Sequence, residues 1–233
     1  PQEYQTEELV FKFAKLLTSK IEIMYNYKVF TNIYKSTYEN LESQLNQDKF
    51  SILNKYLNDD LFLYFEQINR LKYSQRWNHT QRVTKISVMS HLYIVFCISY
   101  ILWILEEKND FEIFEMMKKW LYHDIPEAIT GDIVTPTKSA IEWFRDVLSQ
   151  VEKIMLEENI LNYLWDFEFK NHLNNYILEP FDDELWKIVK IADIFSALLE
   201  AKIEADKSEW YKETFTRVRK VLNQKNFKSI DYM

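Results

Sequence analysis

One stretch of eleven residues gives the most information about the fold and the chemistry of this chain: Tyr122-His123-Asp124-Ile125-Pro126-Glu127-Ala128-Ile129-Thr130-Gly131-Asp132. It places a His-Asp doublet, a Glu one helical turn later, and a third acid after the only glycine of the chain. Imidazole and carboxylate together are the ligands that suit first-row divalent metals. A Glu beside such a metal is a natural proton-transfer group. The stretch therefore predicts a metal-dependent hydrolase.

The composition favours an all-α fold. The chain has 233 residues, of which 47% are hydrophobic, so it can bury a sizeable core in one large domain or two small ones. One glycine and four prolines are too few for a β-rich fold, because β folds need frequent turns and turns rely on these residues. Long helices with few breaks are expected, and no segment alternates in polarity over a length that would predict a strand.

Charge and cysteine content narrow the classes of partner. The net charge is −7 and the pI is about 5.3, which argues against general nucleic-acid binding, because neutralising phosphates needs Lys and Arg. A small phosphate substrate stays open, since a metal can supply positive charge. Cys97 is the lone cysteine, so neither a disulfide framework nor a Cys-based zinc site is expected. The first residues lack the basic and apolar regions of a signal peptide, and a cytoplasmic location is expected.

One segment has the composition of a membrane span. From Ile86 to Leu105 no side chain carries a charge, and this is about the length that crosses a bilayer. His91 lies inside the segment, and an imidazole in mid-membrane would be costly unless it were functional. We therefore expect a buried core helix here and no membrane association.

Hydrophobic periodicity predicts helices along the chain. Apolar positions recur at helical spacing in residues 5–28, and the pattern continues through residues 29–70. This first part contains no histidine and no chemical motif. Residues 1–70 are therefore expected to form a helical extension, either an added layer or a dimerisation element, that is not clearly a separate domain. Residues 71–233 are expected to carry the function, with helices at about 80–106, 110–124, 139–160, 166–177, 182–206 and 208–223.

Polar residues within apolar helices need an explanation. A histidine placed like His91, inside an apolar helix, is more often a core residue than a metal ligand. His123 begins the stretch that contains Pro126 and Gly131, and for it the two interpretations are equally open. Asp193 lies in an apolar helix, and Asp is rarely buried without a partner. It either serves as a ligand or lies on an exposed face, where Lys190 can pair with it at i,i+3. The other two histidines have polar neighbours and are expected at the surface.

The order of His91, His123-Asp124 and Asp193 resembles the H…HD…D signature of the HD-domain metal phosphohydrolases. The chain is most similar to one branch, the YfbR-like 5'-deoxynucleotidases. Members have an Arg-Trp pair before the first His, here Arg76-Trp77, and a K-x-A-D motif around the last Asp. Their HD segment has the pattern HDxxExxTGDxxTPxK, which this chain matches with His123-Asp124, Glu127, Thr130-Gly131-Asp132 and Thr135-Pro136-Thr137-Lys138. The resemblance covers roughly residues 70–206 and implies an HD-domain helical bundle.

The resemblance implies one divalent metal ion, bound by His91, His123, Asp124 and Asp193. Two neutral imidazoles and two carboxylates suit Mn, Co, Fe or Zn, and the sequence does not choose among them. Glu127 lies three residues after Asp124, on nearly the same helical face. It is implied as the catalytic group, which orients or deprotonates the attacking water or protonates the leaving oxygen.

The resemblance also implies a substrate site. Arg76 would clamp the phosphate, because a planar guanidinium fits two oxygens. Trp77 would pack against the sugar or base. Asp132 would help to hold the phosphate–sugar end, aimed by the tight turn that Gly131 permits. Members have an acid directly before the first His, and this chain departs from them with Ser87-Val88-Met89-Ser90-His91.

The implied activity is that of a metal-dependent phosphomonoesterase, a 5'-deoxynucleotidase that releases phosphate from deoxynucleoside monophosphates. A second enzyme hypothesis keeps the metal site but assigns nucleoside triphosphates, or cyclic or signalling nucleotides, as substrates. A third hypothesis is a non-catalytic helical protein that senses nucleotides. A small nucleotide is the expected partner in each case, and a homodimer is one expected assembly. An assay of mono-, tri- and cyclic nucleotides with Mn or Co would separate the three.

Overall fold

The computed structural model describes residues 5–133, 135–138, 141–164, 168–178 and 183–224. These residues form α-helices and short 3₁₀ helices with no β-strand among them, which confirms the predicted all-α fold. The chain divides into two compact units, Pro1–Glu66 and Gln67–Met233.

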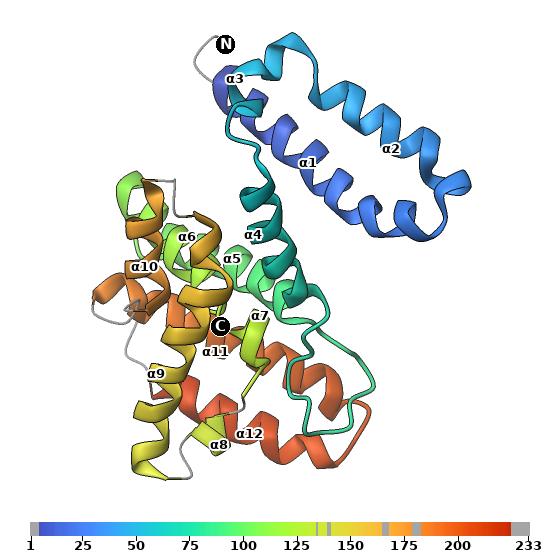
Figure 1. Ribbon diagram of the computed structural model, residues 1–233. Helices are drawn as coiled ribbons and strands as arrows, with labels where there is room; N and C mark the ends of the chain where they lie inside the picture. The colour runs from blue at the N-terminus through green and yellow to red at the C-terminus, as the bar shows by residue number, and fades with distance from the viewer. Residues whose placement is uncertain (1–4, 134, 139–140, 165–167, 179–182, 225–233) are drawn as a thin grey trace. The chain divides into compact units, whose positions relative to one another are not determined.

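The first unit is built on a helical hairpin. Helices α1 (Gln5–Val29) and α2 (Thr31–Leu45) pack against each other, as Figure 1 shows. They are followed by η1 (Asp48–Phe50), α3 (Ser51–Asn54) and α4 (Asp59–Asn69), and the boundary between the units falls within α4. Helical spacing on α1 produces a small core of its own, which consists of Phe13, Leu17, Ile21, Leu45 and Phe50.

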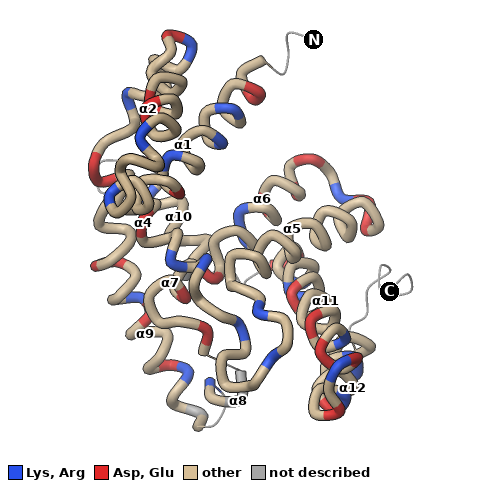
Figure 2. Tube along the Cα trace, turned by 90° about the vertical axis from the view of Figure 1, so that its right-hand side faces the viewer, with Lys and Arg blue, Asp and Glu red and all other residues tan. Residues whose placement is uncertain are grey.

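The second unit is a helical bundle organised around α11 (Glu184–Ala205). This helix packs against α5 (Val88–Leu105), α6 (Asp110–Tyr122) and α12 (Trp210–Asn223). The remaining elements of the unit are η2 (Arg70–Lys72), α7 (Glu127–Thr130), α8 (Thr135–Lys138), α9 (Glu142–Asn159), η3 (Leu161–Leu164) and α10 (Phe169–Leu178). Figure 2 shows acidic and basic residues interspersed along α11 and α12.

Side-chain caps set where the central helices begin. Ser87 caps α5 by accepting a 3.2 Å hydrogen bond from the backbone N–H of Ser90. Asn109 and Glu112 form a reciprocal capping box at the start of α6. Asp183 caps α11 and also pairs with the buried Lys119 of α6 at 2.9 Å. These contacts fix the ends of the three helices that carry the candidate site.

Helix α5 is the uncharged segment that resembles a membrane span. Among the described helices it alone has the length and composition to cross a bilayer, and 39% of its residues are buried. Its buried face includes His91, Val95, Ser99 and Leu102 and packs against α11. A core helix of a bundle has the same length and composition, so these two properties are weak evidence for a membrane span.

Candidate active site

The first pair of candidate ligands lies between two packed helices. His91 on α5 is fully buried, and its Nε2 is 3.1 Å from Oδ1 of Asp193 on α11. On the other side of the ring, Nδ1 lies 3.0 Å from the hydroxyl of Ser196. Burial and the charge of Arg76 oppose protonation of His91, but the contacts with Asp193 and Glu200 outweigh them and raise its pKa.

The two carboxylate oxygens of Asp193 have different neighbours. Its Oδ1 faces His91, while its Oδ2 accepts a hydrogen bond from Lys190 one turn earlier on α11. Burial alone would raise the pKa of Asp193, but the charge of Lys190 and the contact with His91 hold it well below its usual range. Asp193 is therefore an anion, as a metal ligand must be.

The second pair lies where α6 ends. His123 and Asp124 follow the last residue of α6 in a turn, so neighbouring side chains can be directed toward the same point. Nδ1 of His123 lies 2.8 Å from the carbonyl oxygen of Trp120. A carbonyl can only accept, so Nδ1 carries a proton, and in the neutral ring the lone pair is on Nε2. That Nε2 is 3.2 Å from Oδ1 of Asp124.

The four candidate ligands form two pairs rather than one closed cluster. Among the described residues, no three His, Cys, Asp or Glu side chains converge closely enough to hold an ion as they stand. The pairs are nonetheless within electrostatic reach of the same cations, since both Asp124 and Asp193 help to raise the pKa of Arg76 and of Lys190. Helix α11 also packs on α5, which carries His91, and on α6, which ends directly before His123.

The donor set fits a divalent ion. Two imidazoles and two carboxylates match first-row metals, and the Trp120 carbonyl fixes the His123 tautomer that a metal requires. Nε2 of His91 is buried and makes no well-directed hydrogen bond with the described residues, although it faces Asp193. An orphaned buried nitrogen beside a carboxylate is what a ligand pair presents to an ion.

Glu127 has a buried carboxyl whose pKa is shifted. It is the first residue of α7, and its Oε2 is buried and makes no hydrogen bond with the described residues. Burial, followed by the charges of Asp124 and Asp132, raises the pKa of Glu127 well above its usual range. Raised carboxyl pKa values of this kind are typical of groups that donate or accept protons near neutral pH.

Arg76 lies on the loop between η2 and α5. The backbone N–H of Arg76 donates to the carbonyl of Ile86 at 3.0 Å, and that of Val88 donates to Ser74 at 2.9 Å, so the two ends of the loop are tied together. The side chain of Arg76 is 10% exposed, and its Nε lies 3.2 Å from Oε1 of Glu200.

Trp77 is held in a strained conformation beside Arg76. Its φ is 53°, which is rare for a non-glycine residue, and its backbone N–H donates a 2.8 Å hydrogen bond to Oδ2 of Asp132. Gly131, with φ of 72°, gives the chain the positive φ that directs Asp132 toward the loop. The Trp77 ring lies parallel to the ring of Tyr211 at 6.1 Å, with the guanidinium of Arg82 at 4.9 Å.

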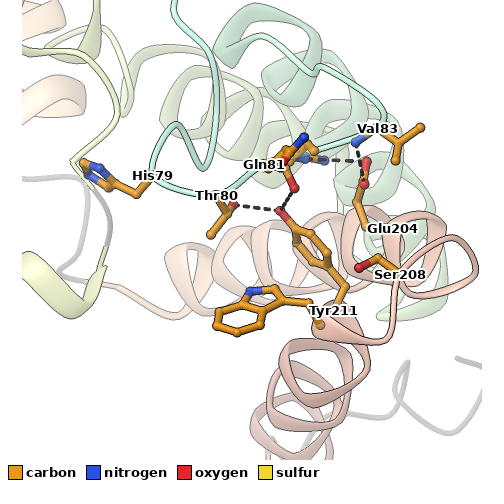
Figure 3. Close-up of a pocket in the computed structure, with 9 residues that line it drawn as sticks. His79, Thr80, Gln81, Val83, Glu204, Ser208 and Tyr211 are labelled. Atoms are coloured by element: carbon orange, nitrogen blue, oxygen red, sulfur yellow. Dashed lines mark hydrogen bonds and ion pairs between the residues drawn. The ribbon is translucent and has the colours of Figure 1, made fainter.

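A pocket of about 520 Å³ opens next to this loop. Residues 79–83 line it on one side, and Glu204, Ser208, Trp210 and Tyr211 line it on the other. Figure 3 shows the Tyr211 hydroxyl directed at Thr80 and Gln81, and the Glu204 carboxylate directed at the backbone of Val83. Its volume lies within the range of small-molecule sites. The walls include Arg82 and Tyr211, which also contact Trp77.

Two further acids on α11 were not singled out from the sequence. Glu200 and Glu204 are both buried. Glu204 accepts hydrogen bonds from the backbone N–H groups of Val83 at 2.9 Å and Thr84 at 2.8 Å. Their spacing from Asp193 could have indicated them, because it places both acids on the same face of an apolar helix as Asp193.

Part of the HD stretch lies near α9. Lys138 is 4.0 Å from Glu152, whose pKa is raised by burial against the opposing charge of Lys138. The charge of Lys138 also lowers the pKa of Glu127 in part, so Lys138 lies within electrostatic reach of the candidate site. The side chains of Thr135 and Pro136 lie outside the described residues.

Comparison with known proteins gives consistent matches. A family model described as 5'-deoxynucleotidase YfbR-like matches residues 63–233. A 5'-deoxynucleotidase of Vibrio atlanticus (strain LGP32) is 27% identical over 177 residues, which is 72% of this chain and 89% of that protein. The crystal structure of an HD-domain phosphohydrolase from Listeria innocua is 25% identical, covers 74% of this chain and 84% of that one, and has a TM-score of 0.61.

A third match extends the fold comparison to a virus. The HD phosphohydrolase DatZ of cyanophage S-2L, bound to dA and one catalytic Zn²⁺ ion, is 18% identical with a TM-score of 0.50. The match covers 71% of this chain and 89% of the DatZ chain, and at 18% identity it shows a shared fold.

Proposed function

Because the chain belongs to the YfbR-like 5'-deoxynucleotidase family of HD phosphohydrolases, we propose that it releases phosphate from deoxynucleoside monophosphates at the site formed by α5, α6, α7 and α11. Membership of this family implies that the protein uses a divalent metal ion and acts on a nucleotide.

His91, His123, Asp124 and Asp193 would hold the metal. Such an ion lowers the pKa of bound water and polarises a phosphoryl oxygen. The observation that carries this assignment is the orientation of the two imidazoles. In each ring Nδ1 contacts an oxygen of the protein, and Nε2 faces the carboxylate of the paired acid. The two pairs would have to converge on one ion, and the charges of Asp124 and Asp193 both raise the pKa of Arg76 and of Lys190.

Glu127 would move the proton. Its buried carboxyl holds a proton to higher pH than an ordinary glutamate, so it can donate to the leaving ribose oxygen and, once ionised, can orient or deprotonate the attacking water. No described side chain hydrogen-bonds Oε2, which leaves that oxygen free for water or substrate.

Arg76 and the loop that carries it would hold the substrate. The guanidinium would clamp the phosphate, and Trp77 would border the sugar or base. Because the Trp77 ring is already supported by Tyr211 and Arg82, it would present a fixed surface. Asp132 would serve the same end through its hydrogen bond to the Trp77 backbone.

Elemental analysis of purified protein, combined with phosphate release from a panel of nucleotides, tests the proposal. We expect one bound metal per chain and turnover of monophosphates above that of triphosphates or cyclic nucleotides. Preferential hydrolysis of triphosphates would move the assignment to the second enzyme hypothesis. Bound metal without hydrolysis of any nucleotide would favour a sensor.

The proposal extends to the metal, the oligomeric state and the cellular location of the protein. Mn, Co, Fe and Zn all suit the donor set, and the DatZ structure contains Zn²⁺ in that protein. A homodimer is proposed because α5 exposes Tyr93, Ile101 and Ile104 by 67%, 55% and 55%. Light scattering of the protein and of Ile101→Glu would test it. Location in the cytoplasm stays a prediction.

A further inference from the structure

Glu200 is a buried carboxylate that touches two parts of the candidate site at once. Its side chain is 2% exposed, and Oε1 lies 3.2 Å from Nε of Arg76 and 3.4 Å from Nδ1 of His91. The other oxygen, Oε2, accepts a 3.0 Å hydrogen bond from Arg82. One carboxyl group therefore joins the proposed phosphate clamp, a proposed metal ligand and the loop between η2 and α5.

We propose that Glu200 is a positioning residue, which orients Arg76 and His91 together and thereby couples phosphate binding to metal binding. The inference rests on the proposed function, because it takes Arg76 as the clamp and His91 as a ligand. A buried carboxylate is costly unless it is paired and hydrogen-bonded, and well-packed apolar residues often stabilise a core equally well. Placement of this charge between two functional side chains is therefore better explained by what it orients.

The contact with His91 acts on the nitrogen that faces away from the paired acid. Nε2 faces Asp193, so the groups around Nδ1 decide the tautomer and the rotation of the ring. Ser196 and Glu200 both lie at Nδ1, at 3.0 and 3.4 Å. A carboxylate there favours Nδ1–H, keeps the lone pair on Nε2 and raises the basicity of the ring.

The contact with Arg76 uses one nitrogen of the guanidinium. Because Glu200 meets Nε, the two terminal nitrogens are not consumed by this pair, and they form a fork that can bind two phosphate oxygens. A long side chain such as Arg loses rotamer freedom on binding. An ion pair that fixes its stem in advance lowers that cost and favours phosphate binding.

Glu204 supplies a matched control. It is buried on the same helix one turn later and also contacts Arg82, with Oε1 3.8 Å from Nε. Its hydrogen bonds go to the backbone of Val83 and Thr84. It therefore shares with Glu200 the support of the loop, but among the described residues its hydrogen bonds and ion pair reach neither Arg76 nor His91.

The test compares Glu200→Gln, Glu200→Asp and Glu204→Gln. Zn²⁺ or Mn²⁺ is titrated into each metal-free protein by calorimetry, and KM and kcat for dAMP are measured on the metal-loaded forms. For Glu200→Gln we expect the metal Kd to rise by about 10–100-fold and KM to rise by about tenfold. Glu200→Asp, which keeps the charge, should recover part of both losses. Glu204→Gln should lower Tm while its metal Kd stays at the wild-type value.

Two results would overturn the proposal. One is a metal Kd for Glu200→Gln within about twofold of wild type, and the other is an equal shift of metal Kd in Glu204→Gln, which would assign the effect to the loop. If Glu200→Gln fails to fold, Glu200→Asp carries the comparison. A wild-type protein that binds metal but hydrolyses no nucleotide would end the proposed function, while the metal titrations would still decide the role of Glu200 toward His91.

Discussion

Replacing Asp132 with Ala is expected to loosen the loop that carries Arg76 and Trp77. The carboxylate accepts a 2.8 Å hydrogen bond from the backbone N–H of Trp77, whose φ is 53°. Strained backbone of this kind costs about 1–3 kcal/mol, and a hydrogen bond to a charged group contributes about 1.5–3 kcal/mol. The two quantities are of similar size, so the hydrogen bond offsets the strain, and Trp77 without it would relax from its present conformation.

Because relaxation of Trp77 returns part of the strain energy, the loss in Asp132→Ala is expected to be at most about 1.5–3 kcal/mol of unfolding free energy. For a unit of this size, about 2–4 °C of Tm corresponds to each kcal/mol, so Tm should fall by at most roughly 3–12 °C. Phosphate release should show a raised KM with a smaller change in kcat, because the displaced loop carries binding groups. Asp132→Asn is the matched control, since its amide oxygen can still accept a weaker hydrogen bond and about half of the loss should return.

Thermal unfolding of the metal-free protein and steady-state kinetics with dAMP measure these quantities. An unchanged Tm together with a hundredfold fall in kcat would refute the reasoning, because the carboxylate would then act directly on the substrate. Equal losses in Asp132→Asn and Asp132→Ala would show that the charge, rather than the hydrogen bond, holds the loop.

Other predictions concern Glu127, Arg76 and the metal. Glu127→Gln should keep its metal by elemental analysis and lose kcat by about 10²–10⁴-fold, the usual contribution of a general acid or base. In metal-free protein the raised pKa of Glu127 means that the folded state binds this proton more tightly than the unfolded state. Its contribution to stability is complete below pH 4.5, the ordinary value, and is lost as pH rises through the higher folded pKa, so the gain in Tm of Glu127→Gln over wild type should grow with pH. Arg76→Lys keeps the charge but loses the fork, and KM should rise by about tenfold, equivalent to about 1.4 kcal/mol, in the same kinetic assay. Chelation should lower the free energy of unfolding by about 2.7 kcal/mol if metal had been present at a hundredfold over its Kd, and added Mn or Zn should restore the Tm.

Helix positions were largely predictable because apolar periodicity decides them. Helices expected at 110–124 and 182–206 occur as α6 and α11 with ends within two residues. The helix expected at 80–106 was wrong at its start, since α5 begins only at Val88. The reason is tertiary, because Glu204 binds the backbone N–H groups of Val83 and Thr84 and so competes with helix formation in that segment.

Contacts between distant residues could not be predicted from local patterns. Asp132 and Trp77 are 55 residues apart, and nothing in either motif indicates that a side chain of one would bind the backbone of the other. For Asp193 the sequence allowed either a buried ligand or a surface partner of Lys190. Oδ1 faces the buried His91 and Oδ2 accepts from Lys190, so both kinds of neighbour occur together, and the ligand role stays a prediction.

One face of α11 explains why so many polar groups are buried in this unit. Asp193, Ser196, Glu200 and Glu204 lie at i, i+3, i+7 and i+11, which at about 100° per residue confines them to an arc of about 80°. Along this stripe the helix meets His91, the loop arginines and the loop backbone in turn. Packed interiors move as units rather than by small independent adjustments. A shift of α11 along α5 would therefore disturb the proposed metal ligands and the proposed phosphate clamp together, and substitutions that alter the stripe should affect both functions rather than either one alone.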